Sequence, residues 1–384
     1  MHVVIAPDKF KGSLSAASVA AAVAAGLVEA VPSATVVQVP VADGGEGTLA
    51  AALAAGFSRV PVRVAGPTGA PLASALAIRG RTAVVEMAAA SGLAVLPDGV
   101  PAPLTATSLG TGQLVRAALD HGCTEVVLGI GGSASTDGGA GLLVGLGAQL
   151  TDADGRDLPP GGAALQFLHR VNLTGLDPRL RSTRVVLATD VDNPLLGRTG
   201  AAAVYGPQKG ASPTDVPVLE AGLARWAAML GESLGPPAAG AADRAGAGAA
   251  GGVGYACLAG LGADRRPGID VVLNLVGFAE LLPGADLVIT GEGSLDAQTL
   301  HGKAPAGVAA RARAAGVPVV AVAGRSLLDP GELRAAGIDA AYTLIDLEPD
   351  AHLCMREAGR LLQRLARRVA RDHLLTPTHR EASR

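Results

Sequence analysis

The chain of 384 residues is long enough for two domains, and since 49% of its residues are hydrophobic but only 2% aromatic, small aliphatic side chains must build its core. The net charge of −3 lacks the basic excess that is typical of nucleic-acid-binding proteins, so we expect no nucleic-acid partner. Three distant cysteines (Cys123, Cys257, Cys354), the lack of a leader-like start and the lack of a bilayer-length apolar segment argue against disulfides, zinc and membranes, and predict a cytoplasmic protein.

The first 60 residues alternate between strand and helix patterns. A buried strand is expected at 2–6, followed by a helix at 14–29 with Ser13 as its N-cap. A second strand at 35–40 leads to a second helix that ends near residue 54. This strand–loop–helix repetition predicts an α/β layer with a parallel sheet.

A different pattern begins near residue 60, where short strands at 62–64, 73–78 and 83–87 are joined by Gly and Pro turns, as in an antiparallel meander. A helix at 108–121, a strand at 125–130 and a Gly-rich helix at 138–147 then resume the α/β alternation.

The region from 150 to 283 is mixed, with a strand at 184–189, a helix at 216–230 and a segment at 235–254 rich in Pro, Ala and Gly. We interpret this segment as a linker or a mobile loop that closes over ligands. Clean alternation returns with a strand at 287–290, a helix at 304–315 and a strand at 317–323. An Arg-rich stretch at 356–371 predicts an amphipathic helix with its basic face in solvent.

These elements predict two α/β domains. The first is a doubly wound parallel-sheet domain formed by 1–60, 105–148 and 284–384, and the second is an inserted mixed α/β domain formed by 61–104 and 149–283.

Three glycine-rich segments are expected to follow strands, at 42–48, 129–135 and 291–296. Such turns emerge at the carboxyl edge of a parallel sheet, where ligands bind, and their amides favour anions. Each segment contains or precedes acidic residues, namely Asp43, Glu46, Asp137, Glu292 and Asp296.

Lysine is rare in this chain. Of its 31 basic residues only Lys9, Lys11, Lys209 and Lys303 are lysines, which leaves 27 arginines. All four lie in short polar segments that contain glycine, and a compact ammonium suits phosphate oxygens. Chance is one explanation of this distribution; the other is that at least two of them contact phosphate or a substrate carboxylate.

Two glycine motifs resemble the pattern of a dinucleotide-binding site. Residues 246–251 read Gly-x-Gly-x-x-Gly but follow no strand, so their context is wrong. Residues 129–134 read Gly-x-Gly-x-x-Ala after a strand, with Asp152 and Asp154 about twenty residues on, which keeps a nicotinamide-dependent oxidoreductase open as an alternative. Ala297 and Ala304 occupy the positions that a P-loop would need as Gly and as Ser or Thr, so there is no P-loop.

Two carboxylates follow the strand at 184–189. Asp190 and Asp192 lie two residues apart on an extended segment, so we expect them to point to one side and to face Mg²⁺ or a hydroxyl group. An Asx turn before Pro194 is the structural alternative. The histidines show no metal-ligand spacing, and no Gly-x-Ser-x-Gly elbow is present.

The chain resembles the type I glycerate kinases, the bacterial glycerate 2-kinase family. Eight segments carry the resemblance, in family order over all but about the last thirty residues: APDKFKGS (6–13), ADGGEGT (42–48), MAAASGL (87–93), GGSASTDGG (131–139), TDVDNPL (189–195), GPQKGA (206–211), GAAGGVG (248–254) and TGEGSLD (290–296) through Lys303. Thr136 and Ser294 depart from the family, which often has Asn and a basic residue at these positions.

The resemblance implies ATP and Mg²⁺ use, D-glycerate as acceptor, 2-phosphoglycerate as product and an active site in the cleft between two domains. A kinase also needs groups that hold phosphates, orient the acceptor hydroxyl and neutralise charge. We therefore expect the following roles: Asp190, Lys11 and Asp296 catalytic, with Asp43 as a further rival base; Asp8, Asp43, Glu46, Lys209 and Lys303 at the substrate; Gly131, Gly132, Ser133, Gly291 and Gly293 at the nucleotide; Asp192 and Glu292 at the metal.

A non-catalytic sensor of glycerate or nucleotide is a second alternative. The sequence leaves open phosphorylation at the 2- or the 3-hydroxyl, and a monomer or a homodimer.

Overall fold

The computed structural model describes residues 1–238 and 240–375, and the chain divides into two compact units. The first unit consists of residues 1–43, 50–55 and 269 onward, and the second of residues 44–49 and 56–268. The second unit is therefore inserted into the first in the chain order.

The first unit is built on a five-stranded sheet that is parallel throughout, in the order β13-β12-β11-β1-β2. Its strands are β1 (His2–Pro7), β2 (Thr35–Gln38), β11 (Leu287–Leu295), β12 (Val319–Ser326) and β13 (Ala340–Thr343). Its helices are α1 (Ala16–Ala30), α9 (Gly268–Leu275), α10 (Phe278–Leu281), α11 (Ala304–Ala314), α12 (Pro330–Ala335), α13 (Ala351–Arg356) and α14 (Ala358–Ala370).

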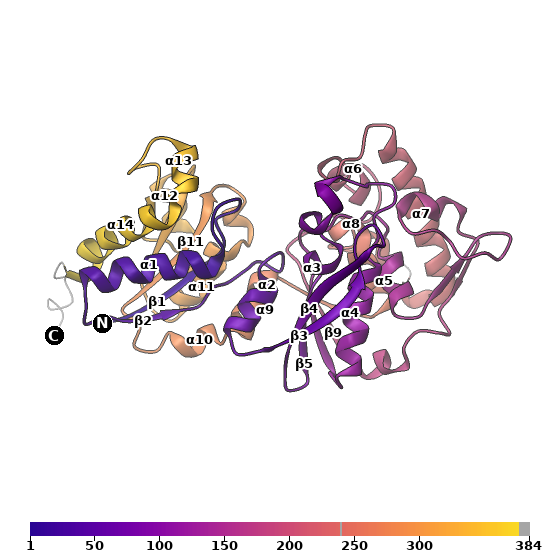
Figure 1. Ribbon diagram of the computed structural model, residues 1–384, viewed down its shortest axis with the longest axis horizontal. Coiled ribbons are helices and arrows are strands. Elements are labelled where there is room, and N and C mark those ends of the chain that lie inside the picture. The colour runs from indigo at the N-terminus through magenta and orange to yellow at the C-terminus, as the bar shows by residue number, and fades with distance from the viewer. Residues whose placement is uncertain (239, 376–384) are drawn as a thin grey trace. The chain divides into compact units, whose positions relative to one another are not determined.

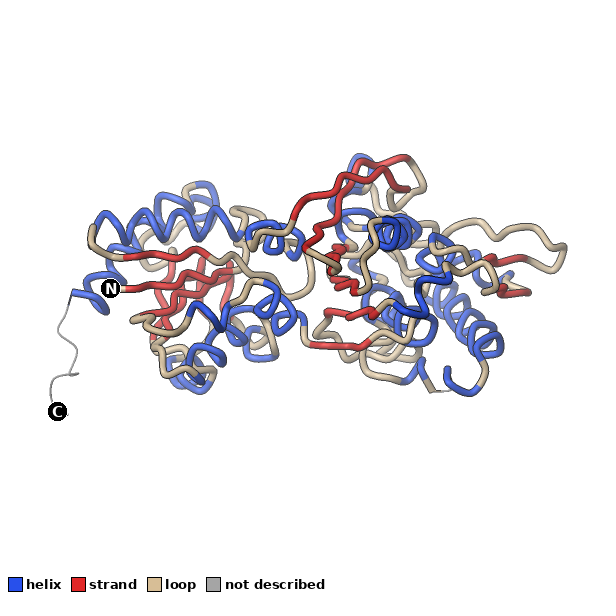
Figure 2. Tube along the Cα trace, turned by 90° about the horizontal axis from the view of Figure 1, so that it is seen from below, coloured by secondary structure: helices blue, strands red, loops and turns tan. Residues whose placement is uncertain are grey.

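Strand β1 explains why this sheet has helices on both faces. Val3 and Ile5 pack in one apolar cluster with α1 and α14, whereas Val4 and Ala6 pack in another with α9 and α11. Successive side chains of a strand point to opposite faces, so a continuous apolar run feeds two cores. Figure 2 shows these strands, near the N label, as a layer between helices. This is the predicted doubly wound sheet.

Helices α1 and α14 lie side by side in Figure 1. A Cβ at Gly26 of α1 would lie 2.2 Å from the carbonyl oxygen of Gln363 in α14, so only glycine permits this approach. Helix α14 buries Leu361 and Leu365 and exposes Arg364, so the predicted amphipathic helix is confirmed.

The second unit contains a six-stranded mixed sheet in the order β10-β9-β6-β5-β4-β3, in which β3–β4 and β4–β5 pair antiparallel and the rest parallel. Its strands are β3 (Ser58–Ala65), β4 (Pro71–Arg79), β5 (Thr82–Glu86), β6 (Glu125–Gly129), β9 (Arg184–Ala188) and β10 (Asp264–Arg266), and β7 (Gln149–Thr151) pairs with β8 (Arg170–Asn172). Its helices are α3 (Ala88–Ser91), α4 (Leu109–Asp120), α5 (Ala140–Gly145), α6 (Ala201–Tyr205), α7 (Asp215–Leu234) and α8 (Ala249–Gly260), while α2 (Thr48–Ala54) spans the division between the units.

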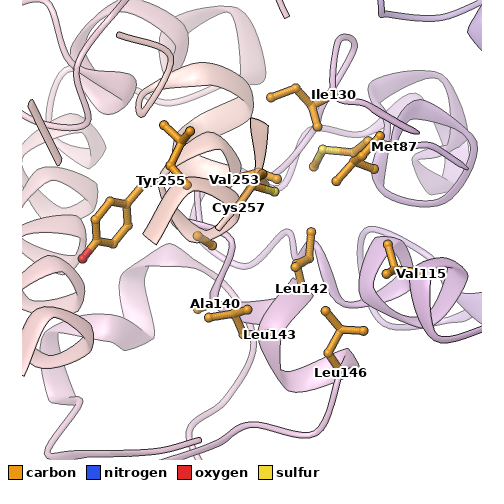
Figure 3. Packing of buried hydrophobic residues seen from close by; sticks show 14 of the residues in the cluster. Met87, Val115, Ile130, Ala140, Leu142, Leu143, Leu146, Val253, Tyr255 and Cys257 are labelled. Carbon is orange, nitrogen blue, oxygen red and sulfur yellow. The ribbon is translucent and has the colours of Figure 1, made fainter. Parts of the chain in front are cut away.

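The core of this unit joins helices α4, α5 and α8 to the sheet. Figure 3 shows Val115 of α4, Leu142 of α5 and Val253 and Cys257 of α8 together with Met87 and Ile130 beyond the strand ends. Small aliphatic side chains dominate this core, as the composition predicts.

Two expectations about the elements and the domains differ from the structure. Residues 105–148 cluster with the second unit, because β6 pairs with β5 and β9 there. Ser15, not Ser13, caps α1: Ser15 Oγ accepts a hydrogen bond from the backbone N of Ser18 at 3.1 Å. Ser13 Oγ instead donates to the carbonyl oxygen of Met355 at 2.6 Å.

The segment at 235–254 was predicted to be a linker or a closing loop, and for its second half this prediction is wrong. Residues 246–249 and 251–254 are buried and lead into α8, which packs in the core. Its composition is misleading because its glycines serve close packing: a Cβ at Gly254 would lie 1.9 Å from the carbonyl oxygen of Gly246.

Candidate functional site

Acidic side chains gather at the carboxyl edge of the sheet in the first unit. Asp8 follows β1, Asp43 lies beyond the neighbouring strand β2, and Glu292 lies near the end of β11 on the other side of β1. Parallel strands end at one edge, so residues far apart in sequence meet there. This edge contains the predicted substrate residues Asp8 and Asp43 and the predicted metal residue Glu292.

Burial and mutual repulsion change the proton affinity of these acids. Burial raises the pKa of Asp8 to about 7, opposed by Lys9 and assisted by the negative charges of Asp43 and Glu292. The pKa of Glu292 is also raised, first by burial and then by Asp296 and Asp43, although Thr299 and Lys303 lower it. A cationic ligand would relieve this repulsion.

Glu292 also organises the segment that follows β11. Thr299 Oγ1 donates to Glu292 Oε1 at 2.6 Å, and Lys303 Nζ lies 3.7 Å from Glu292 Oε2 and 3.9 Å from Asp296 Oδ1. Lys11, in the turn after β1, is exposed. The first unit thus has two of the predicted cations and a buried carboxylate cluster.

The sequence predicted a loop at 291–296, and this prediction is wrong because strand β11 continues to Leu295. Gly291 pairs with Pro7 on one side and Val322 on the other. A Cβ at Gly291 would lie 2.1 Å from the carbonyl oxygen of Val322, so this glycine permits close strand packing. Gly293 also lies in the strand, where it pairs with no residue of β1.

In the second unit, two glycine loops lie against each other at the ends of β5, β6 and β9. The backbone N of Gly131 donates to the carbonyl oxygen of Gly44 at 3.3 Å, and a Cβ at Gly44 would lie 2.8 Å from the carbonyl oxygen of Ala188. Gly132 is exposed with φ of 78°, and Ser133 is buried behind it. The loop of residues 131–133 therefore presents bare backbone at its apex.

Two buried side chains hold the C-terminal side of this loop and the residues that follow it. Asp137 Oδ2 accepts hydrogen bonds from the backbone N and Oγ of Ser108 at 2.8 and 2.9 Å. Lys209, only 2% exposed, donates from Nζ to Ser133 Oγ at 2.7 Å and to the carbonyl oxygen of Ser135 at 2.5 Å. Burial lowers the pKa of Lys209 to about 7, while Asp137 opposes the shift.

The two carboxylates of the predicted pair after β9 have different partners. Asp190 Oδ1 accepts from the backbone N of Gly268 at 3.0 Å, whereas Asp192 is exposed and pairs with Arg265. Asn193 Oδ1 accepts from Tyr205 at 2.6 Å, and its amide nitrogen donates to the carbonyl oxygen of Thr199 at 2.8 Å. Asp190 and Asp192 therefore have different partners and different exposure, and their common direction stays a prediction.

Comparison with known proteins decides what these sites belong to. A sequence model described as the Glycerate kinase family matches residues 3–374. The chain belongs to the glycerate kinase family. It is therefore an ATP-dependent kinase, as the resemblance predicted.

Relatives of this glycerate kinase family member match it over nearly their whole length. A glycerate kinase of Bacillus subtilis is 44% identical over 98% of this chain and 99% of the relative, and a glycerate 2-kinase of Escherichia coli is 45% identical over 90% and 91%. A solved chain from Salmonella typhimurium LT2, provisionally described as glycerate kinase 2, has a TM-score of 0.82 at 44% identity and covers 97% of this chain and 98% of that one.

The structure gives no support to the alternative of a nicotinamide-dependent oxidoreductase. Helix α5 begins only at Ala140, six residues after the motif at 129–134 ends. Asp152 and Asp154 both pair with Arg156 on an exposed turn. The motif therefore lacks the helix and the acidic partner that a dinucleotide site needs.

Magnesium chemistry fits the donors that are present. Within residues 1–238 and 240–375 no group of three or more His, Cys, Asp or Glu side chains is arranged to hold a metal ion. Kinases commonly hold Mg²⁺ through one or two carboxylates and the phosphates of the nucleotide, so a complete protein cage is not required. Glu292 and Asp192 are both candidates, and each already has a cationic neighbour, Lys303 beside Glu292 and Arg265 beside Asp192.

Sequence reasoning missed three side chains that organise these sites, namely Glu86, Thr299 and Trp226. Glu86 Oε2 accepts from the backbone N of Gly47 and Leu49, and Trp226 Nε1 donates to the carbonyl oxygen of Gly138 at 2.9 Å. The sequence contained one indication of Glu86, because a charged residue there ends an apolar strand.

Among the described residues, no helix combines the length and the apolar character needed to span a membrane.

Proposed function

We propose that this protein transfers the γ-phosphoryl group of ATP to the 2-hydroxyl group of D-glycerate, giving 2-phosphoglycerate and ADP. The observation that carries the proposal is the 45% identity, over 90% of the chain, to the relative named glycerate 2-kinase. The paired glycine loops of the second unit and the charged edge of the first agree with a phosphotransferase.

In the second unit, Gly131, Gly132 and Ser133 are proposed to cradle the nucleotide phosphates. An exposed apex without a side chain lets phosphate oxygens approach the backbone closely, which favours anion binding. Glu46, exposed in the neighbouring loop, is proposed to contact hydroxyl groups of the substrate.

Asp190 is proposed to orient and deprotonate the acceptor hydroxyl. The hydroxyl oxygen forms a bond to the γ-phosphorus, the bond from that phosphorus to the ADP oxygen breaks, and the hydroxyl proton passes to Asp190. The hydrogen bond from Gly268 fixes the carboxylate in one orientation, which a general base requires. Asp296 and Asp43 remain rival candidates for this role.

In the first unit, Lys11 and Lys303 are proposed to neutralise phosphate or carboxylate oxygens, with Asp8 and Asp43 at the substrate. Gly293 is proposed to contact the nucleotide, and Gly291, which packs within the sheet, is proposed to support it from behind. Glu292, with Asp192 as the second candidate, would hold Mg²⁺, which when bound neutralises charge on the phosphate oxygens.

ADP release measured with and without D-glycerate tests the activity, and a phosphorus NMR spectrum of the product tests the position. Phosphate on the 3-hydroxyl would contradict the 2-kinase assignment. ADP release that does not depend on glycerate, or nicotinamide reduction without ATP turnover, would contradict the kinase itself. Binding of glycerate or nucleotide without turnover would favour a sensor.

The roles of Asp190 and Lys11 are tested by Asp190→Asn and Lys11→Ala. Each should lower kcat/KM well beyond threefold, since a threefold change is only about 0.7 kcal/mol of transition-state stabilisation. Asp243→Asn, at an exposed aspartate of the second unit, is the matched control and should retain wild-type kinetics.

A further inference from the structure

Lys209 is enclosed by protein on every side. It lies in the short 3₁₀ turn Pro207–Lys209, is 2% exposed and ends at two oxygens of one loop, Ser133 Oγ and the carbonyl oxygen of Ser135. Both partners are uncharged, so the ammonium is held by hydrogen bonds rather than by a contact ion pair.

Such an arrangement is unfavourable for stability. A buried cation without a contacting carboxylate costs free energy, and an apolar side chain of the same length in that space is often neutral or stabilising. The neighbouring hydroxyls Ser135 Oγ and Thr136 Oγ1 are also buried, and no hydrogen-bond partner for them exists among the described residues. Polar groups that weaken a fold and gather behind one loop indicate a role in the function of that loop.

A second segment packs against the residues that follow this loop. Residues 250–252 form a left-handed turn, in which Ala250 has φ of 54°, and the carbonyl oxygen of Gly251 accepts from the backbone N of Gly138 at 2.9 Å. A Cβ at Gly251 would lie 2.2 Å from the carbonyl oxygen of Ser135 and 2.9 Å from Lys209 Nζ. The missing Cβ of Gly251 thus leaves room for the Lys209 ammonium.

We propose that Lys209 is a positioning residue: it touches neither substrate, and its buried ammonium fixes Ser133 and the glycine apex in the geometry that binds the nucleotide phosphates. This inference rests on the proposed function, in which residues 131–133 bind those phosphates. It gives Lys209 a different role from the direct substrate contact that the sequence suggested. Preorganisation of a binding loop lowers the entropy lost on binding, so its loss raises KM.

Lys209→Met tests the proposal because methionine fills similar space without charge or donor. The expected result is a melting temperature within about 3 °C of wild type or higher, and a KM for ATP raised roughly tenfold or more, with a smaller change in kcat. A merely structural lysine would behave in the opposite way: less folded enzyme lowers the apparent kcat and leaves KM unchanged. Arg181→Met, at an exposed arginine of the same unit, is the matched control and should change neither quantity.

A double-mutant cycle with Ser133→Ala separates this inference from the proposed function. If Lys209 acts through Ser133, the double variant should lose less than the product of the two single losses in kcat/KM. If Ser133→Ala lowers kcat/KM while Lys209→Met stays within threefold of wild type, only the positioning role of Lys209 is overturned. The same holds if the loss of kcat/KM in the double variant equals the product of the two single losses. Normal kinetics in Ser133→Ala overturn the assignment of the loop itself. Should Lys209→Met fail to fold, Lys209→Gln, which keeps a donor but no charge, undergoes the same measurement, and an unchanged KM there contradicts the proposal.

Discussion

Glu86 Oε2 lies 2.9 Å from the backbone N of Leu49, and the backbone N of Gly47 donates to the same oxygen at 3.1 Å. A buried carboxylate at the end of β5 thus holds the start of α2 and the glycine loop before it. Negative charge at a helix N-terminus satisfies donors that lack partners within the helix.

We expect Glu86→Ala to lower the free energy of unfolding by about 1.5–3 kcal/mol, the range for hydrogen bonds to a charged group. Glu86→Gln keeps an acceptor oxygen and should lose less. Urea unfolding measures both values, with Glu232→Gln on the exposed face of α7 as the control, expected within about 0.5 kcal/mol. Equal stability of the Ala variant and wild type would show that the loop does not depend on this carboxylate.

The raised pKa of Asp8 predicts a pH dependence with a definite sign. Between about pH 4 and pH 7 the folded protein keeps a proton on Asp8 that the unfolded chain has released, so this group makes stability fall as pH rises. Glu292, whose pKa is also raised, contributes with the same sign.

Asp8→Asn removes the titrating group, so its free energy of unfolding relative to wild type should rise from pH 4 to pH 7.5, by at most about 4 kcal/mol. Urea unfolding at several pH values measures the difference between the two curves. Asp346→Asn, at an exposed position of the same unit, should run parallel to wild type. Parallel curves for Asp8→Asn would contradict the pKa of about 7.

The left-handed turn at 250–252 predicts opposite effects at neighbouring positions. Ala250 has φ of 54°, so Ala250→Gly relieves backbone strain and offsets the greater freedom of the unfolded chain; stability should stay within about 1 kcal/mol of wild type. Gly251→Ala should cost about 2 kcal/mol or more, because its Cβ would lie 2.2 Å from the carbonyl oxygen of Ser135 and φ is 69°. Thermal unfolding of both variants measures this, and similar losses in the two would refute the turn.

Trp226, the single tryptophan, donates a hydrogen bond to the carbonyl oxygen of Gly138, which follows the loop of residues 131–133. Trp226→Phe leaves this buried acceptor without its donor, and we expect a loss of about 1–3 kcal/mol. Unfolding must be followed by far-ultraviolet circular dichroism, since the variant lacks the fluorophore. Phe167→Leu, at a ring that is 71% exposed, should change stability by less than about 0.5 kcal/mol, and an equal effect of the two would argue against the hydrogen bond.

Much of the fold could be read from local patterns. The meander at 58–86, the strands β6 and β9 and the helices α4, α7 and α14 each have the period or the flanking turns that the sequence predicted. Two of the errors arose where glycines serve close packing. At 291–295 and 249–254 glycines admit neighbouring backbones, and sequence composition does not distinguish this use from a loop.

The sequence by itself determined the α/β class, the order of the glycine loops and the family, because these depend on hydrophobic period and on ordered motifs along the chain. Only the tertiary structure decided which charges meet. The proximity of Asp8, Asp43 and Glu292, and the contact of Lys209 with Ser133, join residues between about 35 and 285 positions apart. Burial at these places, which no local pattern encodes, shifts the proton affinities and turns a lysine that looks like a ligand into an internal support for a loop.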